Sequence, residues 1–121
     1  MSRSDGLRVW HAAREFAEVV STLARDLPRT APAGLRAQLA AAAHSVSSNI
    51  AEGAGRGTNG EMVQFFRLAR GSLEETQSNL RICANTSLIE RKKFYPVWNR
   101  SVAINRMLAG LIDRLSKGKN D

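Results

Sequence analysis

The sequence has 121 residues, of which 43% are hydrophobic, and its formal net charge is +7. This length fits one domain with one core, and the apolar fraction excludes a disordered chain. The single cysteine, Cys83, excludes an internal disulfide and a thiolate metal cluster. We expect it to be a buried apolar side chain on a helix.

The positive charge is uneven along the chain. Eight of the 18 Lys and Arg residues, but only three of the 11 acidic residues, lie from Glu90 onward. A basic surface favours an anionic partner, with nucleic acid the first choice, and solubility alone explains such a charge equally well. The N-terminal stretch MSRSDGLRVW is charged throughout, and apolar runs such as LAAAA at 39–43 are too short to span a bilayer. We therefore expect a soluble, cytoplasmic protein with no membrane partner.

Four segments repeat apolar residues at alternating steps of three and four, which is the spacing of one helix face. No segment alternates with period two, so we expect an all-α protein without strands. Short connections make successive helices antiparallel. The sequence therefore predicts one domain over 1–121, an up-down-up-down four-helix bundle, with helices at residues 7–27, 32–56, 59–85 and 91–116.

Helix-breaking residues mark the connections between these segments. LPRTAPAG, at 27–34, holds two prolines and a glycine, which end the first helix and favour the start of the second. Gly57 is well placed to end the second helix, and Thr58 with Glu61 forms a capping box that opens the third. Pro96 either marks the true start of the fourth helix or bends its first turns.

The fourth predicted helix has an apolar edge beside its core stripe, formed by Trp98 and Ile112 with Asn105 between them. The second helix is rich in alanine, which leaves little apolar volume for one chain to bury. The edge is either part of a wide core face or a surface for self-association, and we favour self-association.

Polar residues form a stripe on the second helix, about 100° from the row of core residues. The third helix carries a counterpart, in which Gly71 suggests the close approach of another group. The stripe is either solvated or a buried network that fixes the register of the two helices. An exposed Glu52–Arg56 pair contributes only about 0.3–0.5 kcal/mol, so we favour the network. Its members are Gln38, Ser45, Asn49, Glu52, Arg56, Ser72 and Glu75.

The same residues do not form a recognisable catalytic or metal site. His44 directly precedes Ser45, so the two side chains lie on different helix faces and give no triad. Neither His11 nor His44 has an acidic residue three positions before it, as a di-iron bundle requires. GAGRG at 53–57 lacks the order of a phosphate-binding loop. We expect no catalytic, cofactor or metal site.

Two stretches resemble the bacterial four-helix-bundle family of 23S rRNA-intervening-sequence proteins. They are GLRAQLAAAAHSVSSNIAEGAGRG, at 34–57, and FFRLARGSLEETQSNL, at 65–80. The most specific part is NIAEG, and the likeness covers about residues 7 to 115 of this chain. Val46 replaces the usual isoleucine, while Thr76 and Gln77 stand where leucine and glutamate are common. The matching positions are Leu35, Gln38, Leu39, Ala42, Ala43, Ser45, Asn49, Ile50, Ala51, Glu52, Gly53, Arg56, Phe66, Ala69, Gly71, Ser72, Leu73 and Glu75.

This resemblance implies a four-helix fold and a ring-shaped homopentamer, and it implies no known reaction. Some members of the family are encoded within inserted segments of ribosomal RNA genes. By fold analogy and charge, the chain is also distantly similar to the accessory variability determinant of diversity-generating retroelements. That relative is a basic pentamer that binds nucleic acid and a reverse transcriptase, and the analogy is a weaker warrant than the NIAEG stretch.

Two functions fit these observations. The first is a non-enzymatic oligomer that contacts the phosphates of RNA or DNA through a basic edge of the fourth helix, repeated in every subunit of a ring. The alternative is a protein-interaction scaffold that docks a partner such as a reverse transcriptase, in which the charge only aids solubility. The basic edge consists of Lys92, Lys93, Arg100, Arg106 and Arg114.

Overall fold

The computed structural model describes residues 3–118 of the chain and contains four helices. No strand occurs in that range, so the protein is all-helical, as the apolar repeats predict. The helices are α1 (Arg3–Arg25), α2 (Leu35–Ala54), α3 (Asn59–Asn85) and α4 (Arg91–Ser116).

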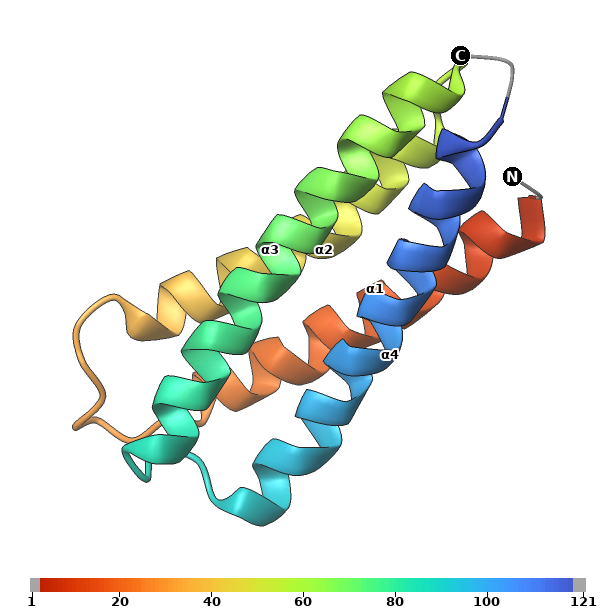
Figure 1. The fold of residues 1–121 in the computed structure, drawn as a ribbon. Helices are drawn as coiled ribbons and strands as arrows, with labels where there is room; N and C mark the ends of the chain where they lie inside the picture. Colours follow the sequence, from red (N-terminus) through yellow and green to blue (C-terminus); the bar gives the residue numbers. More distant parts are fainter. Residues whose placement is uncertain (1–2, 119–121) are drawn as a thin grey trace.

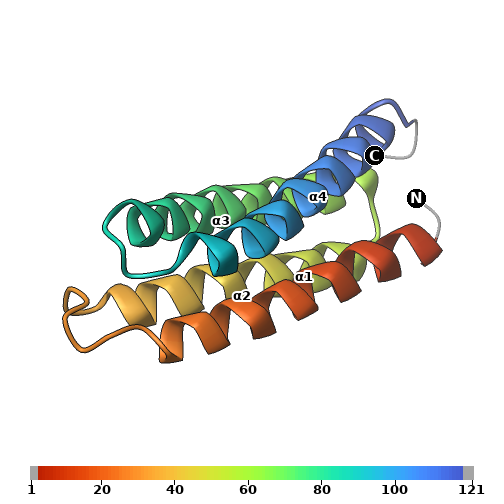
Figure 2. The ribbon, with the colours of Figure 1, turned by 90° about the horizontal axis from the view of Figure 1, so that it is seen from below.

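The four helices pack as a bundle, in which each helix contacts two neighbours in the cyclic order α1, α2, α3, α4. Successive helices are joined at alternate ends of the bundle (Figure 1). The α2–α3 turn lies at the end that holds the start of α1 and the end of α4, and the other two loops lie at the opposite end. Seen from below, α1 with α2 and α3 with α4 form two layers (Figure 2). This arrangement places the first helix directly beside the last.

The connection between α1 and α2 is longer than the sequence predicts. α1 ends at Arg25 rather than 27, and the side chain of Arg36 donates hydrogen bonds to the carbonyls of Ala24 (2.9 Å) and Leu27 beyond it. These bonds satisfy carbonyl groups that the end of a helix leaves without partners. α2 begins at Leu35 rather than 32, because Gly34 before it adopts a left-handed conformation with φ of 85°.

The α2–α3 turn also differs in detail from its prediction. α2 ends at Ala54 with Gly55 as its cap, so Gly57 lies within the turn and does not end the helix. The capping position of Thr58 is as expected, since its hydroxyl accepts a hydrogen bond from the Glu61 backbone N–H at 3.2 Å. α3 and α4 have the ranges expected from the sequence, and Pro96 lies inside α4 rather than at its start.

The core runs along the centre of the bundle. Its largest fully buried side chains come from all four helices: Phe16, Phe66, Leu39, Ile50, Leu73, Leu80, Ile104, Leu108 and Leu115. Cys83 is buried among them as expected, and burial raises the pKa of its thiol because the charged thiolate is poorly solvated there. Within residues 3–118, every buried side-chain nitrogen and oxygen has a hydrogen-bond partner.

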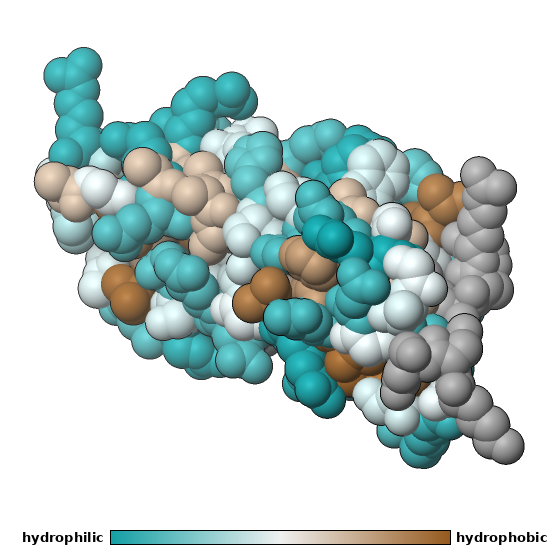
Figure 3. Space-filling view, turned by 90° about the horizontal axis from the view of Figure 1, so that it is seen from above, coloured by the Kyte–Doolittle hydropathy of each residue, from teal (hydrophilic) through white to brown (hydrophobic). Residues whose placement is uncertain are grey.

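The outer surface is mainly hydrophilic, with small separate apolar patches on the face shown in Figure 3. Four large hydrophobic side chains are about half exposed, namely Leu7, Leu68, Ile82 and Tyr95. None of the helices between residues 3 and 118 is long and apolar enough to cross a membrane.

Candidate functional site

Three members of the predicted polar stripe form a half-buried cluster that joins α2 to α3. The hydroxyls of Ser45 and Ser72 lie 2.8 Å apart across the two helices. The Asn49 side-chain amide donates to both the backbone carbonyl (2.9 Å) and the hydroxyl (3.1 Å) of Ser45. Ser45 is therefore held from both sides, and this cluster ties the register of α2 to that of α3.

Gly53 has a packing role in the same pair of helices. It is buried, and a Cβ at this position would meet the Phe66 ring at 2.8 Å and the Phe65 Cβ at 3.0 Å. Both separations are shorter than side-chain contacts allow, so α3 packs at a distance that only glycine permits. The glycine of NIAEG is thus explained by close packing. By contrast, Gly71 is exposed, and a Cβ there would meet no atom within 4 Å among the described residues. The expectation of a close approach at Gly71 is wrong within the bundle.

Glu52 and Arg56 form an ion pair on the surface. Their charged groups are 3.0 Å apart, and the side chains are 59% and 40% exposed, respectively. The guanidinium of Arg56 also lies 3.9 Å from Glu61 and 4.6 Å from the centre of the Phe65 ring. Arg56 therefore links the end of α2 to the start of α3 across solvent-exposed contacts, outside the Ser45 cluster.

The remaining members of the stripe stay apart from the cluster. Gln38 and Glu75 are exposed, and the side chain of neither makes a hydrogen bond or ion pair within residues 3–118. Within one chain, the stripe thus divides into a half-buried network and a set of solvated side chains.

The apolar edge of α4 packs against α3 inside the chain. The Arg81 guanidinium lies 4.5 Å from the centre of the Trp98 ring, and Arg70 donates to the Asn105 side-chain oxygen at 3.3 Å. Ile112 is buried. This edge was expected to favour self-association, and the structure instead uses it as the α3–α4 seam, because two arginines of α3 reach over it.

The five basic residues predicted on α4 are all exposed. Three of them have acidic neighbours: Lys92 lies 3.4 Å from Glu90, Arg100 lies 3.5 Å from Glu15, and Arg114 lies 3.8 Å from Asp5. Glu15 and Asp5 belong to α1, so the acidic side chains of one helix partly neutralise the basic edge of the other.

Lys93 and Arg106 make no ion pair within residues 3–118. The predicted basic edge therefore keeps unneutralised charge at both halves of α4.

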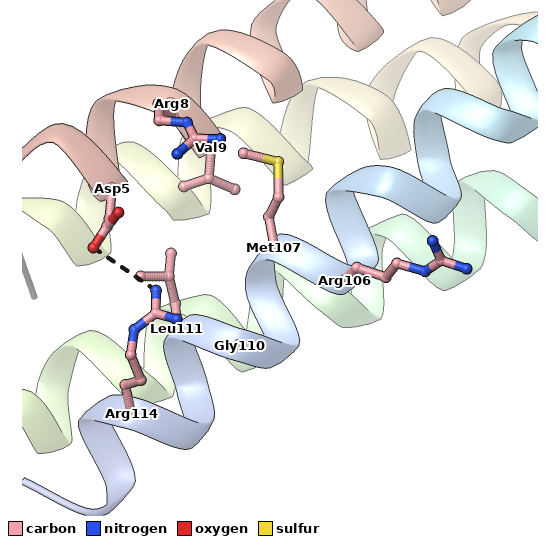
Figure 4. A pocket seen from close by; sticks show the side chains of 8 residues that line it. All are labelled: Asp5, Arg8, Val9, Arg106, Met107, Gly110, Leu111 and Arg114. Atoms are coloured by element: carbon pink, nitrogen blue, oxygen red, sulfur yellow. Dashed lines mark ion pairs between the residues drawn. The ribbon is translucent and has the colours of Figure 1, made fainter.

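Near the end of α4, this edge borders a groove of about 240 Å³ between α1 and α4 (Figure 4). Val9 and Leu111 are buried beneath it, and charged side chains from both helices stand at its rim. We did not predict Arg8, the α1 residue at this rim. The usable signal is topological, because a closed four-helix bundle places the first turns of its first helix beside the last turns of its fourth. The groove is lined by Asp5, Arg8, Val9, Arg106, Met107, Gly110, Leu111 and Arg114.

No group of three or more His, Cys, Asp or Glu side chains is arranged to hold a metal ion in the described part of the chain. His44 instead lies 3.3 Å from the Ser21 hydroxyl of α1, on the exposed surface.

These features define the class of the protein as an all-helical four-helix bundle. A family model described as "23S rRNA-intervening sequence protein" matches residues 5–110, and the chain belongs to this family. A crystal structure of a protein of unknown function from the S23 ribosomal protein family of Bacteroides thetaiotaomicron has a similar fold. Its TM-score is 0.81 at 23% sequence identity, over 86% of this chain and 97% of that one. No curated protein matches the chain.

Proposed function

We propose that this protein is a non-enzymatic, cytoplasmic four-helix bundle that binds RNA or DNA through the basic edge of α4. In this proposal the bundle is antiparallel and assembles into a ring-shaped homopentamer, so that each subunit presents one copy of the edge. Several weak sites on one ring then act together through their high effective concentration. The observation that carries the proposal is the exposure of all five basic side chains along one helix.

The ion pairs on this edge are compatible with such binding. The separations of 3.4 to 3.8 Å join exposed side chains, and exposed pairs contribute about 0–1 kcal/mol each. Phosphate groups can therefore replace the acidic neighbours at little cost. Binding of this kind releases counterions from the nucleic acid, so its affinity falls steeply as salt rises.

The test is binding of the purified protein to single-stranded RNA and to duplex DNA over about 50 to 200 mM salt, a range in which several phosphate contacts change the affinity by orders of magnitude. We expect binding at low salt with a steep salt dependence. A triple variant, Lys93→Gln with Arg100→Gln and Arg106→Gln, is expected to bind more weakly and to flatten the salt dependence by about three ions released. Absence of binding by the unaltered protein at low salt would overturn the proposal.

The control removes three positive charges elsewhere, with Arg25→Gln, Arg29→Gln and Arg67→Gln. These side chains are exposed and lie outside the basic edge of α4. Equal weakening by both triple variants would mean that only net charge matters and that the edge has no particular role. Mass photometry of the same samples measures the oligomer, and a monomer at all concentrations would contradict the ring.

A protein-interaction scaffold, with a partner such as a reverse transcriptase, is the second candidate. The observation that favours it is the exposure of Leu68 and Ile82, at 52% and 48%, on α3. Isolated exposed apolar residues are common, so this support is weaker. If the scaffold role holds, Leu68→Glu abolishes capture of the partner, whereas charge reversal at Lys92 and Lys93 does not.

A further inference from the structure

The groove between α1 and α4 combines an apolar floor with a positively charged rim. Three arginines and one aspartate line it, and the rim therefore carries an excess of positive charge. Figure 4 shows Arg8 and Arg114 on two sides of the space between the helices, with Asp5 beside Arg114. Arg106 extends along α4 away from that pair. The charges thus come from two helices and border one open space.

The arginines of this groove are incompletely neutralised. Arg114 and Asp5 are 3.8 Å apart, and both are solvent-accessible. Arg8 and Arg106 are exposed and make no ion pair within residues 3–118. A single aspartate therefore balances one of three guanidinium groups, and the other two remain available to an anion from solvent.

The geometry favours a phosphate group over a carboxylate. A carboxylate has two oxygens, which one arginine fork already satisfies. A phosphate presents more acceptor oxygens in a tetrahedral arrangement, so guanidinium groups that approach from two directions can bind it together. Arg8 on α1 and Arg114 on α4 approach the groove from opposite helices.

We propose that this groove is a phosphate-binding subsite, in which Arg8 and Arg114 hold one phosphate group between α1 and α4 and Arg106 contacts a neighbouring phosphate. The inference rests on the proposed function for the two residues of α4, and it goes further by assigning Arg8 and a defined position. The phosphate belongs either to a nucleic-acid backbone or to a free polyphosphate.

The experiment titrates the full-length protein with tripolyphosphate and, separately, with a short single-stranded RNA, using NMR or calorimetry. Arg8→Gln is expected to weaken RNA binding by about three- to tenfold, because it removes one charge-assisted phosphate contact. The matched control is Arg25→Gln, which removes the same charge from the other end of α1. Both side chains are exposed, and an unchanged melting temperature verifies that neither variant is misfolded.

The outcomes separate the source of the phosphate and the two proposals. Arg8-dependent binding of RNA alone supports a backbone phosphate, and Arg8-dependent binding of tripolyphosphate supports a free one. If RNA binds but Arg8→Gln behaves like Arg25→Gln, the subsite is wrong and the proposed function stands. If neither RNA nor DNA binds but tripolyphosphate binds through Arg8, the proposed function fails and the subsite stands. Arg8-dependent binding of polyglutamate as tight as that of tripolyphosphate would overturn the preference for phosphate.

Discussion

The α2–α3 seam and the α1–α4 seam of this bundle are built in opposite ways. In the first, Gly53 lets the ring of Phe66 approach closely, and Ser45 and Ser72 join the helices by a short hydrogen bond. In the second, the helices are joined at the surface by long ion pairs, and a groove remains between them. The first seam fixes geometry, and the second leaves charged groups free to meet a ligand.

This difference bears on the meaning of the family's NIAEG stretch. The stretch lies in the tightly packed seam, where its glycine and its asparagine serve packing and hydrogen bonding. The groove lies on the other side of the bundle and uses residues outside the stretch. Family membership therefore reports on the fold, whereas a binding function in this chain depends on residues that the stretch does not contain.

The largest effect should come from opening the tight seam. Phe66→Ala removes a fully buried ring, and such changes cost about 3–5 kcal/mol of unfolding free energy. Met107→Ala is the matched change at the α1–α4 groove, where the side chain is only half-buried, and it should cost about 1 kcal/mol. Denaturant unfolding measures both. Equal losses would mean that the two seams do not differ in packing.

The next effect concerns the two glycines. Gly53→Ala should lower the unfolding free energy by about 1–2 kcal/mol, since overpacking costs about 1–3 kcal/mol and the gain in helix propensity returns about 1. Gly71→Ala has open space around it and should raise stability by about 0.5–1 kcal/mol. Thermal and denaturant unfolding give the sign of each change. A destabilised Gly71→Ala in a sample shown to be monomeric would contradict the structure.

A smaller effect is expected from the hydroxyl pair. Ser72→Ala should cost about 1 kcal/mol, the usual value of a partly buried hydrogen bond. Ser78→Ala provides the reference for the change itself, because that side chain is exposed on the same helix. A double-mutant cycle with Ser45→Ala isolates the interaction between the two hydroxyls. A coupling energy near zero would show that the bond does not contribute to stability.

The smallest effect belongs to the exposed ion pair. Glu52→Gln should reduce stability by about 0.3–0.5 kcal/mol at low salt, and less at high salt. Glu75→Gln should leave the stability of the monomer unchanged, because the carboxylate is exposed and has no ion pair within residues 3–118. If Glu75→Gln instead changes the oligomer measured by mass photometry, the residue acts between subunits.

The sequence predicted the helices well because apolar spacing reflects burial directly. It placed the start of α2 at 32 rather than at Leu35, since neither the φ of Gly34 nor the reach of Arg36 across the loop leaves a periodic signal. The candidate site was harder. Two glycines of one family pattern looked alike in sequence, but Gly53 faces a ring and Gly71 faces open space. Arg8 was missed because its role depends on which helices are neighbours in space.

The buried thiol of Cys83 gives this bundle a built-in chemical reporter. Because burial shields the sulfur and raises the pKa of the thiol, the native chain holds it protonated and out of reach at neutral pH. A thiol reagent should therefore modify the protein only when the helices separate. The labelling rate then follows the frequency of opening, without any engineered probe, because the chain contains no other cysteine.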